Sequence, residues 1–182
     1  MRKTLVAVAI GAAVSLSACS DNEQQATANQ AEQQAEQQPE QSQQAATEQN
    51  PFYEPSPLQY QAPDFNAIEF EHFKPAFEKG MQEHMAEIEA IANNSAEPTF
   101  ENTIVAMEKS GAILNRVSSV FYNLSSSHSN DQIRELQAEL APKMAAHGDN
   151  ISLNANLFAR IKSLYEQRED LGLDNESQRL LE

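Results

Sequence analysis

Histidine is the side chain here that is best suited to bind a metal ion or transfer a proton near neutral pH. The chain of 182 residues contains four histidines: His72, His84, His128 and His147. None begins an H-E-x-x-H pair, which would place two imidazoles on one helix face for zinc with a glutamate base between them. We therefore interpret His84 as part of a solvated helix face. His147 lies on an apolar stripe and is interpreted as a core or boundary residue.

A serine near a histidine is the second arrangement that could do chemistry, because nucleophilic hydrolysis uses such a pair. Three serines at 125–127 precede His128. Polar turn chemistry explains this run better than a nucleophile and base. The sequence has no G-x-S-x-G, no G-x-G-x-x-G and no P-loop, and its five glycines are scattered. The residues alone therefore predict no catalytic site and no metal site in this chain.

Cys19 is the only cysteine, which excludes a disulfide within the chain. It follows the parts of an export signal: Arg2 and Lys3, then an apolar stretch at 5–14. That stretch is too short to remain as a spanning helix, which needs about 20 apolar residues. Residues 16–19 read L-S-A-C. An ordinary signal peptidase prefers a small residue three positions before the cut, and Leu16 does not fit.

The L-S-A-C sequence resembles the lipobox of bacterial lipoproteins. This resemblance implies cleavage between Ala18 and Cys19 and attachment of a diacylglyceryl group to the Cys19 thiol. Several acyl chains on one residue anchor firmly, because each buried CH₂ adds about 0.8 kcal/mol. Ser20, and not aspartate, follows the cysteine, which by resemblance to Gram-negative sorting implies the outer membrane, facing the periplasm. The alternative is an ordinary secreted protein with one stray cysteine.

Charge excludes one class of partner. The net charge is −15, and removal of residues 1–18, which contain two basic and no acidic residues, makes it −17. Such a chain is not expected to bind nucleic acid through phosphate neutralisation. Because anionic surfaces repel a chain of this charge, a membrane would have to hold it through the lipid on Cys19 and not through its surface charge.

The next two segments differ in composition. Residues 19–49 carry the expected lipidated cysteine and a run rich in Gln, Ala and Glu, which lacks the apolar residues of a core and is expected to be a disordered tether. Residues 50–69 contain four prolines and several aromatic residues and are expected to lie extended on a surface. The expected anchors of that segment are Phe52, Tyr53, Leu58, Tyr60 and Phe65.

From residue 70 to 182 the apolar spacing is helical. The first helix is expected to end at Asn93, and the second to start at a Thr99 cap and continue to Leu124 with Gly111 in its middle. A turn at 125–131 separates it from a third helix, capped by Ser129 or Asn130.

The third helix should kink at Pro142. The fourth helix is expected to begin at an Asn154 cap and to carry Phe158 and Tyr165 on its apolar stripe, and a fifth to begin at Asp174. The fold class is therefore all-α, built of antiparallel helical hairpins. The last helix would be only two turns long, so we expect the chain to be the truncated start of a longer protein.

Several runs within residues 50–182 resemble the N-terminal region of bacterial peptidyl-dipeptidases (dipeptidyl carboxypeptidases), of the thimet oligopeptidase family of zinc metallopeptidases. The most specific are F-K-P-A-F at 73–77, A-E-I-E-A-I at 86–91 and P-T-F-E-N-T-I at 98–104. The run E-L-A-P-K at 139–143 and the run S-Q-R-L-L-E at 177–182 fit as well.

This resemblance implies two helical lobes around a channel that admits short peptides, with zinc bound by an H-E-x-x-H helix and a downstream glutamate in the C-terminal half. The chain would then be part of the covering N-terminal lobe, without a zinc ligand and inactive alone. Two alternatives stay open. One is a tethered helical lipoprotein that acts as a binding or structural module, and the other is a lobe supplied in trans to a separate catalytic half. We expect weak folding of the lobe alone, because its apolar stripes need a partner.

Overall fold

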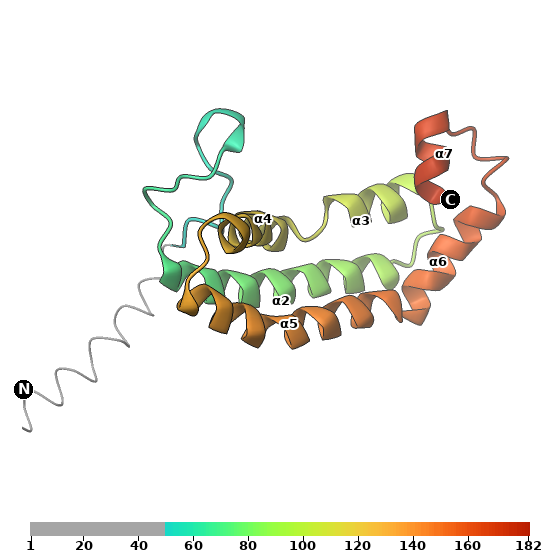
Figure 1. The fold of residues 1–182 in the computed structure, drawn as a ribbon. Helices are drawn as coiled ribbons and strands as arrows, with labels where there is room; N and C mark the ends of the chain where they lie inside the picture. The colour runs from blue at the N-terminus through green and yellow to red at the C-terminus, as the bar shows by residue number, and fades with distance from the viewer. Residues whose placement is uncertain (1–49) are drawn as a thin grey trace, which may run out of the picture. The chain divides into compact units, whose positions relative to one another are not determined.

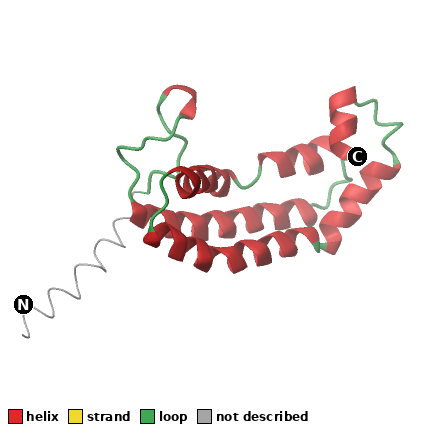
Figure 2. Ribbon diagram, in the orientation of Figure 1, coloured by secondary structure: helices red, strands yellow, loops and turns green. Residues whose placement is uncertain are grey.

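The computed structural model describes residues 50–182, which form helices joined by loops, with no strand in that range (Figures 1 and 2). The predicted all-α class is confirmed. The predicted signal peptide, Ala18, Cys19 and the tether to residue 49 lie outside the described residues. The helices are α2 (Phe73–Ala92), α3 (Ala106–Lys109), α4 (Ala112–Ser127), α5 (Asp131–Ser152), α6 (Ala155–Glu166) and α7 (Asn175–Leu181). Three short helical turns accompany them: η1 (Gln59–Gln61), η2 (Phe70–His72) and η3 (Phe100–Val105).

Most helix starts lie where the capping residues predict them. The cap side chains accept hydrogen bonds from backbone N–H groups three residues on, in the pairs Thr99–Asn102 (3.1 Å), Asn130–Ile133 (2.9 Å), Asn154–Leu157 (3.0 Å) and Asp174–Ser177 (2.8 Å). Helix α2 ends at Ala92, directly before the predicted stop at Asn93. Helix α5 continues through Pro142 over 22 residues. None of the helices in residues 50–182 is long and apolar enough to cross a membrane.

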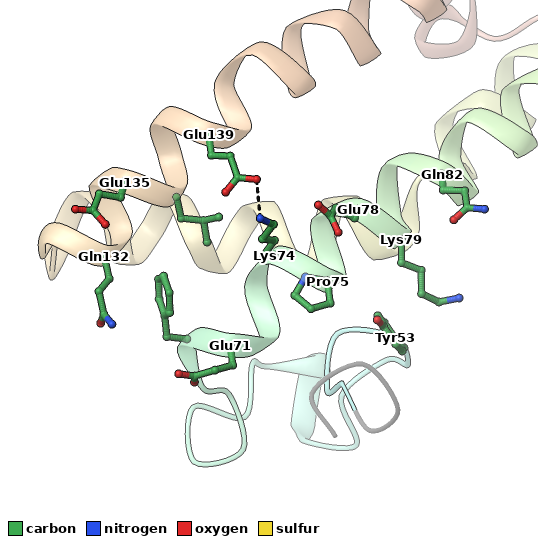
Figure 3. Close-up of a pocket in the computed structure, with 12 residues that line it drawn as sticks. Tyr53, Glu71, Lys74, Pro75, Glu78, Lys79, Gln82, Gln132, Glu135 and Glu139 are labelled. Atoms are coloured by element: carbon green, nitrogen blue, oxygen red, sulfur yellow. Dashed lines mark ion pairs between the residues drawn. The ribbon is translucent and has the colours of Figure 1, made fainter. Parts of the chain in front are cut away.

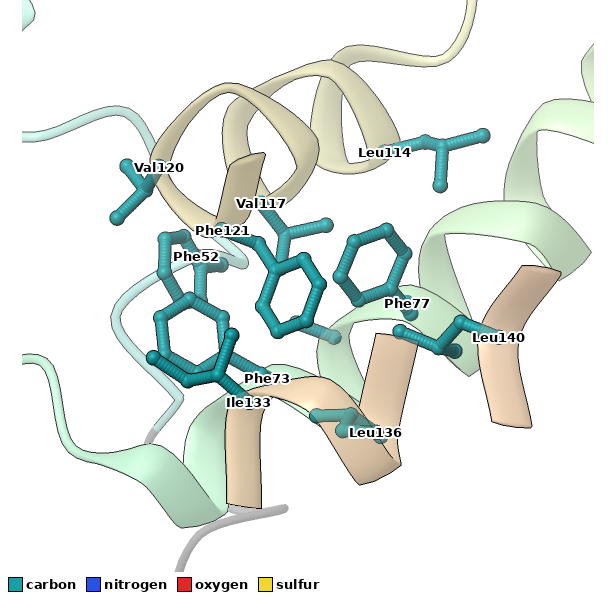
Figure 4. Packing of buried hydrophobic residues seen from close by; sticks show 11 residues of the cluster. Phe52, Phe73, Phe77, Leu114, Val117, Val120, Phe121, Ile133, Leu136 and Leu140 are labelled. Carbon is teal, nitrogen blue, oxygen red and sulfur yellow. The ribbon is translucent and has the colours of Figure 1, made fainter. Parts of the chain in front are cut away.

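The main core lies between α2, α4 and α5 (Figure 4). Phe77 and Phe121 are completely buried there, and their rings meet edge to face with centroids 5.4 Å apart. Such aromatic pairs add to the free energy of apolar burial. The close approach of α2 and α4 depends on Gly80, because a Cβ there would lie 2.8 Å from the backbone nitrogen of Leu114. Small size at this one position therefore sets the packing of the two helices.

The prediction that Gly111 lies inside one long helix is wrong. The chain forms a π-type turn at η3 and a single turn at α3, and then breaks at Ser110 before α4 begins. Gly111 is the residue before α4 and has a φ of 72°, in the left-handed region that glycine adopts without steric cost. The apolar spacing continues in phase across this break, which is why the sequence reads as continuous.

The turn predicted at residues 125–131 is shorter than expected. Helix α4 extends to Ser127, so the turn between α4 and α5 is only the stretch from His128 to Asn130. The hydroxyl groups of Ser126 and Ser127 donate to the carbonyls of Tyr122 and Asn123, four residues back in the helix. These two hydroxyl groups therefore bond to the backbone of the last turns of α4.

Segment 50–69 is anchored by fewer residues than predicted. Phe52 is buried and Tyr53 is partly buried, as expected. The prediction is wrong for Leu58, Tyr60 and Phe65, whose side chains are 45%, 93% and 56% exposed. The apolar character of these three residues predicts burial, but no surface within residues 50–182 covers them.

The buried face of helix α6 differs from the predicted one. Leu157 and Leu164 are buried, whereas Phe158 and Tyr165, which were predicted to lie on the apolar stripe, are exposed. Arg160 occupies the buried face instead, which the apolar spacing does not predict.

Candidate functional site

Two of the four histidines meet although 63 residues separate them in the sequence. Nε2 of His147 on α5 lies 3.0 Å from Nδ1 of His84 on α2, in hydrogen-bonding distance. His147 is buried, which confirms the prediction that it is a core or boundary residue. His84 is only partly exposed and faces His147, so the prediction that it lies on a solvated helix face is wrong. His72 lies elsewhere, where its Nδ1 accepts from the backbone N–H of Glu69 (2.9 Å).

Burial lowers the pKa of both rings in this pair, because a charged imidazole loses solvation there. The His84 ring lowers the pKa of His147 further, while Glu87 opposes the shift at His84. Both lowered pKa values favour neutral rings at neutral pH, where one ring donates a hydrogen bond to the other. The pair is therefore a hydrogen-bonded contact between α2 and α5.

The helix break before α4 lies next to the histidine pair. The backbone N–H of Gly111 donates to a carboxylate oxygen of Glu87 (2.7 Å), and a Cβ on Gly111 would lie 3.0 Å from the His84 ring. Gly111 is thus required both for its left-handed backbone and for the space beside His84. Spacing along the chain could not reveal this arrangement, because it joins α2, α4 and α5.

An open groove of about 950 Å³ runs between α2 and α5 (Figure 3). Lys74 and Lys143 both contact the carboxylate of Glu139 at 2.8 Å. These two ammonium groups lower the pKa of Glu139 to about 2. A carboxylate that is held ionised in this way is a weak general base near neutral pH. The groove is therefore lined mainly by charged and polar side chains.

A second hollow, of about 470 Å³, lies between segment 50–68 and α4. Arg116 on α4 fixes the start of the segment, since its guanidinium donates to the carbonyls of Phe52 (2.9 Å) and Tyr53 (2.8 Å). The amide of Asn50 donates to the carbonyl of His72 (2.7 Å). Hydrogen bonds therefore hold the segment that forms one side of the hollow, and α4 forms the other side.

Arg160, which no sequence motif predicts as a contact residue, fixes the loop between α2 and η3. It donates to the carbonyls of Asn94 and Ala96 and to the side chains of Asn102 and Thr103, at 2.8 to 3.2 Å. The signal in the sequence is an arginine at a position where the helical spacing of α6 calls for an apolar residue. Arg160 therefore ties α6 to the loop after α2 and to η3.

No group of three or more His, Cys, Asp or Glu side chains that could hold a metal ion is found among residues 50–182. The histidine pair offers two imidazoles without a third such ligand. The ionisable groups described above are engaged in ion pairs, helix caps or contacts between helices. The geometry of the described residues thus supports binding and positioning.

No family model matches this chain. It is, however, 45% identical over 133 residues to the dipeptidyl carboxypeptidase of Salmonella typhimurium and 46% identical over 136 residues to that of Escherichia coli. The matches cover 73% and 75% of this chain. The chain spans only about a fifth of the length of these curated relatives, since each match covers 20% of the relative. The resemblance to bacterial peptidyl-dipeptidases that the sequence motifs predict is therefore confirmed.

Proposed function

We propose that this chain is a helical lobe of a peptidyl-dipeptidase, an enzyme that releases dipeptides from the C-termini of short peptides. The observation that carries the proposal is the identity of 45% and 46% to two proteins named dipeptidyl carboxypeptidase. Helices α2, α4 and α5 supply a packed scaffold with open surfaces at the α2–α5 groove and beside segment 50–68. Such a scaffold suits positioning within a larger enzyme.

The zinc expected from the resemblance would be held outside residues 50–182, because the described residues do not offer three suitable ligands together. The enzyme's zinc-dependent step is therefore assigned to no residue of this lobe. The gene tests this proposal. Reading the DNA past the codon for Glu182, or the neighbouring genes, should reveal an H-E-x-x-H motif with a downstream glutamate codon. Absence of such a motif from the whole locus would contradict the proposal.

A lipid anchor at Cys19 is the second part of the proposal. It is supported by the L-S-A-C sequence at 16–19 behind an apolar stretch of ten residues. Mass spectrometry of the N-terminal peptide should find Cys19 as the first residue, carrying acyl chains. A Cys19→Ser variant should move from the outer-membrane fraction to the soluble fraction. An unmodified thiol on a membrane-free wild-type protein would contradict the anchor.

A tethered binding module is the alternative function. The completely buried Phe77, Val117 and Phe121 favour it, since α2, α4 and α5 bury a core without any other part of a peptidase. This alternative predicts a cooperative thermal transition of the 182-residue product, followed by circular dichroism. A broad, non-cooperative melt would contradict it and would agree with the expectation that the lobe folds weakly alone.

A further inference from the structure

The loop at residues 58–65 presents an unusual group of exposed side chains. Leu58, Tyr60 and Phe65 lie within eight residues and are 45%, 93% and 56% exposed. The only charged residue among the eight is Asp64. Single exposed apolar residues are ordinary on protein surfaces, but a contiguous apolar patch marks an interaction site. These three residues, called the loop patch below, place three large exposed side chains in one short loop, which is a feature of contact surfaces.

The backbone of the loop supports the same conclusion. Tyr60 and Gln61 have φ values of 58° and 56°, in the left-handed region that residues other than glycine rarely adopt. The loop's own hydrogen bonds are local, from Gln61 N–H to the Leu58 carbonyl (2.9 Å) and from Ala62 N–H to the Gln59 carbonyl (3.2 Å). Strained conformations persist where surrounding contacts determine them. Because Tyr60 is almost fully exposed, the described residues supply no such contact to its side chain.

The hollow lies beside the loop, which contributes Gln61, Pro63 and Asp64 to its lining. Prolines at 55, 57 and 63 line it together with Ile68 and, on α4, Val120. Proline fixes its own backbone, and Arg116 holds the carbonyls of Phe52 and Tyr53. The surface is thus formed before any partner arrives, which reduces the entropy that binding costs.

The relatives contain a large part that this chain does not match. Any span of 133 residues in a chain of 182 contains residues 58–65, so the loop lies within the matched region of both dipeptidyl carboxypeptidases. In each relative, four fifths of the protein lies outside that region. The loop is therefore shared with proteins that possess a large further part.

Charge argues against two other occupants. Residues 50–69 contain no Lys or Arg and three acidic residues, whereas surfaces that bind anionic lipid are basic. A second copy of a chain with a net charge of −15 would be repelled.

From these observations we infer that the loop patch and its hollow are the docking surface for the catalytic lobe of the peptidase. The inference rests on the proposed function. The matching surface of that lobe should be apolar at its centre and basic at its edge, opposite Glu54, Asp64 and Glu69. It can belong to the same polypeptide or to a separate one.

Photo-cross-linking in the cells that produce the protein tests this inference directly. Benzoylphenylalanine replaces Tyr60 in the full chain, and mass spectrometry identifies the cross-linked peptides. We expect peptides related to the unmatched part of the dipeptidyl carboxypeptidases, in or outside the same polypeptide. The same probe at Phe158, which is 62% exposed on α6, is the control for nonspecific capture. Cross-links from position 60 only to lipid, to a second copy or to nothing would overturn the inference.

A second experiment separates the docking surface from the proposed function. The full chain is affinity-purified with whatever it retains, and dipeptide release by this material is measured. In a Leu58→Ser, Tyr60→Ser, Phe65→Ser variant, retention of the catalytic lobe should fall more than about tenfold, as for loss of an aromatic anchor. Where both lobes are one polypeptide, limited proteolysis between them allows retention to be measured. Phe158→Ser and Tyr60→Phe should retain the lobe. Activity that stays with the triple variant would overturn the docking surface alone, whereas wild-type material without any dipeptide release would contradict the proposed function.

Discussion

The main core and the loop patch contain similar side chains in opposite surroundings. Phe77 and Phe121 are completely buried between α2, α4 and α5, whereas Tyr60 and Phe65 are 93% and 56% exposed. Burial of a large apolar side chain contributes roughly 1.5–3 kcal/mol, and an exposed one contributes little. The core residues thus stabilise this lobe itself, and the loop residues are free to stabilise a contact with a partner. The following substitutions test that division.

The largest effect is expected in the core. Phe77→Ala removes a completely buried ring that meets Phe121 edge to face, and it should lower the free energy of unfolding by about 3–5 kcal/mol. Chemical denaturation followed by circular dichroism measures the loss. Phe65→Ala is the matched control and should change stability by less than about 0.5 kcal/mol. Equal losses at the two positions would erase the contrast between core and loop.

A pair of glycine substitutions sharpens the account of the core. Gly80→Ala forces a Cβ to within 2.8 Å of the Leu114 backbone and should cost about 1–3 kcal/mol through overpacking. Gly148→Ala meets nothing within 4 Å inside α5 and should stabilise the protein by roughly 0.5–1 kcal/mol, because alanine favours a helix. A stabilising shift for Gly80→Ala in thermal melts, like the one expected for Gly148→Ala, would show that α2 and α4 are not in close contact at Gly80.

The histidine pair makes stability depend on pH. Since burial lowers both pKa values from the ordinary value of about 6.5, the unfolded chain binds protons more readily than the folded one. The contribution of the neutral pair to the free energy of unfolding is therefore complete above about pH 6.5, and it is lost as the pH falls through the lowered pKa values. We expect the stability lost on acidification to be smaller than the stability lost in Gly80→Ala.

Denaturation at pH 7.5 and pH 5 measures this difference in stability. His147→Gln should reduce it by removing one titrating ring while an amide remains to bond His84. His128→Gln, in an exposed residue outside the pair, should keep the wild-type difference. A His147→Gln protein that loses as much stability on acidification as the wild type would exclude the pair as the cause.

The smallest effect on stability is expected at the tip of the loop. Tyr60→Asn places a residue that tolerates the left-handed region at a φ of 58°, and it removes a side chain that touches little. Stability should stay the same or rise by up to about 1 kcal/mol, as measured by denaturation. A loss above 1 kcal/mol would mean that Tyr60 serves the fold of this lobe and not a partner.

The sequence predicts the helical class and most helix starts, because caps such as Asn154 and Asp174 act locally and are visible in four consecutive residues. It does not predict the break at Gly111, since the apolar spacing passes through it in phase. The contact between His84 and His147 depends on how α2 and α5 align, which no local pattern records. The predicted burial of Tyr60 failed for a related reason, because apolar character favours burial without naming the surface that provides it.

The release of C-terminal dipeptides from a short blocked peptide, followed by mass spectrometry, tests the central claim most directly. The mature chain through Glu182 is assayed alone and together with the H-E-x-x-H-containing polypeptide from the same locus. If the chain is a lobe of a peptidyl-dipeptidase, it releases no dipeptide alone, and the complete pair releases dipeptides in succession. Release by the chain alone, or none by the pair, would contradict the account.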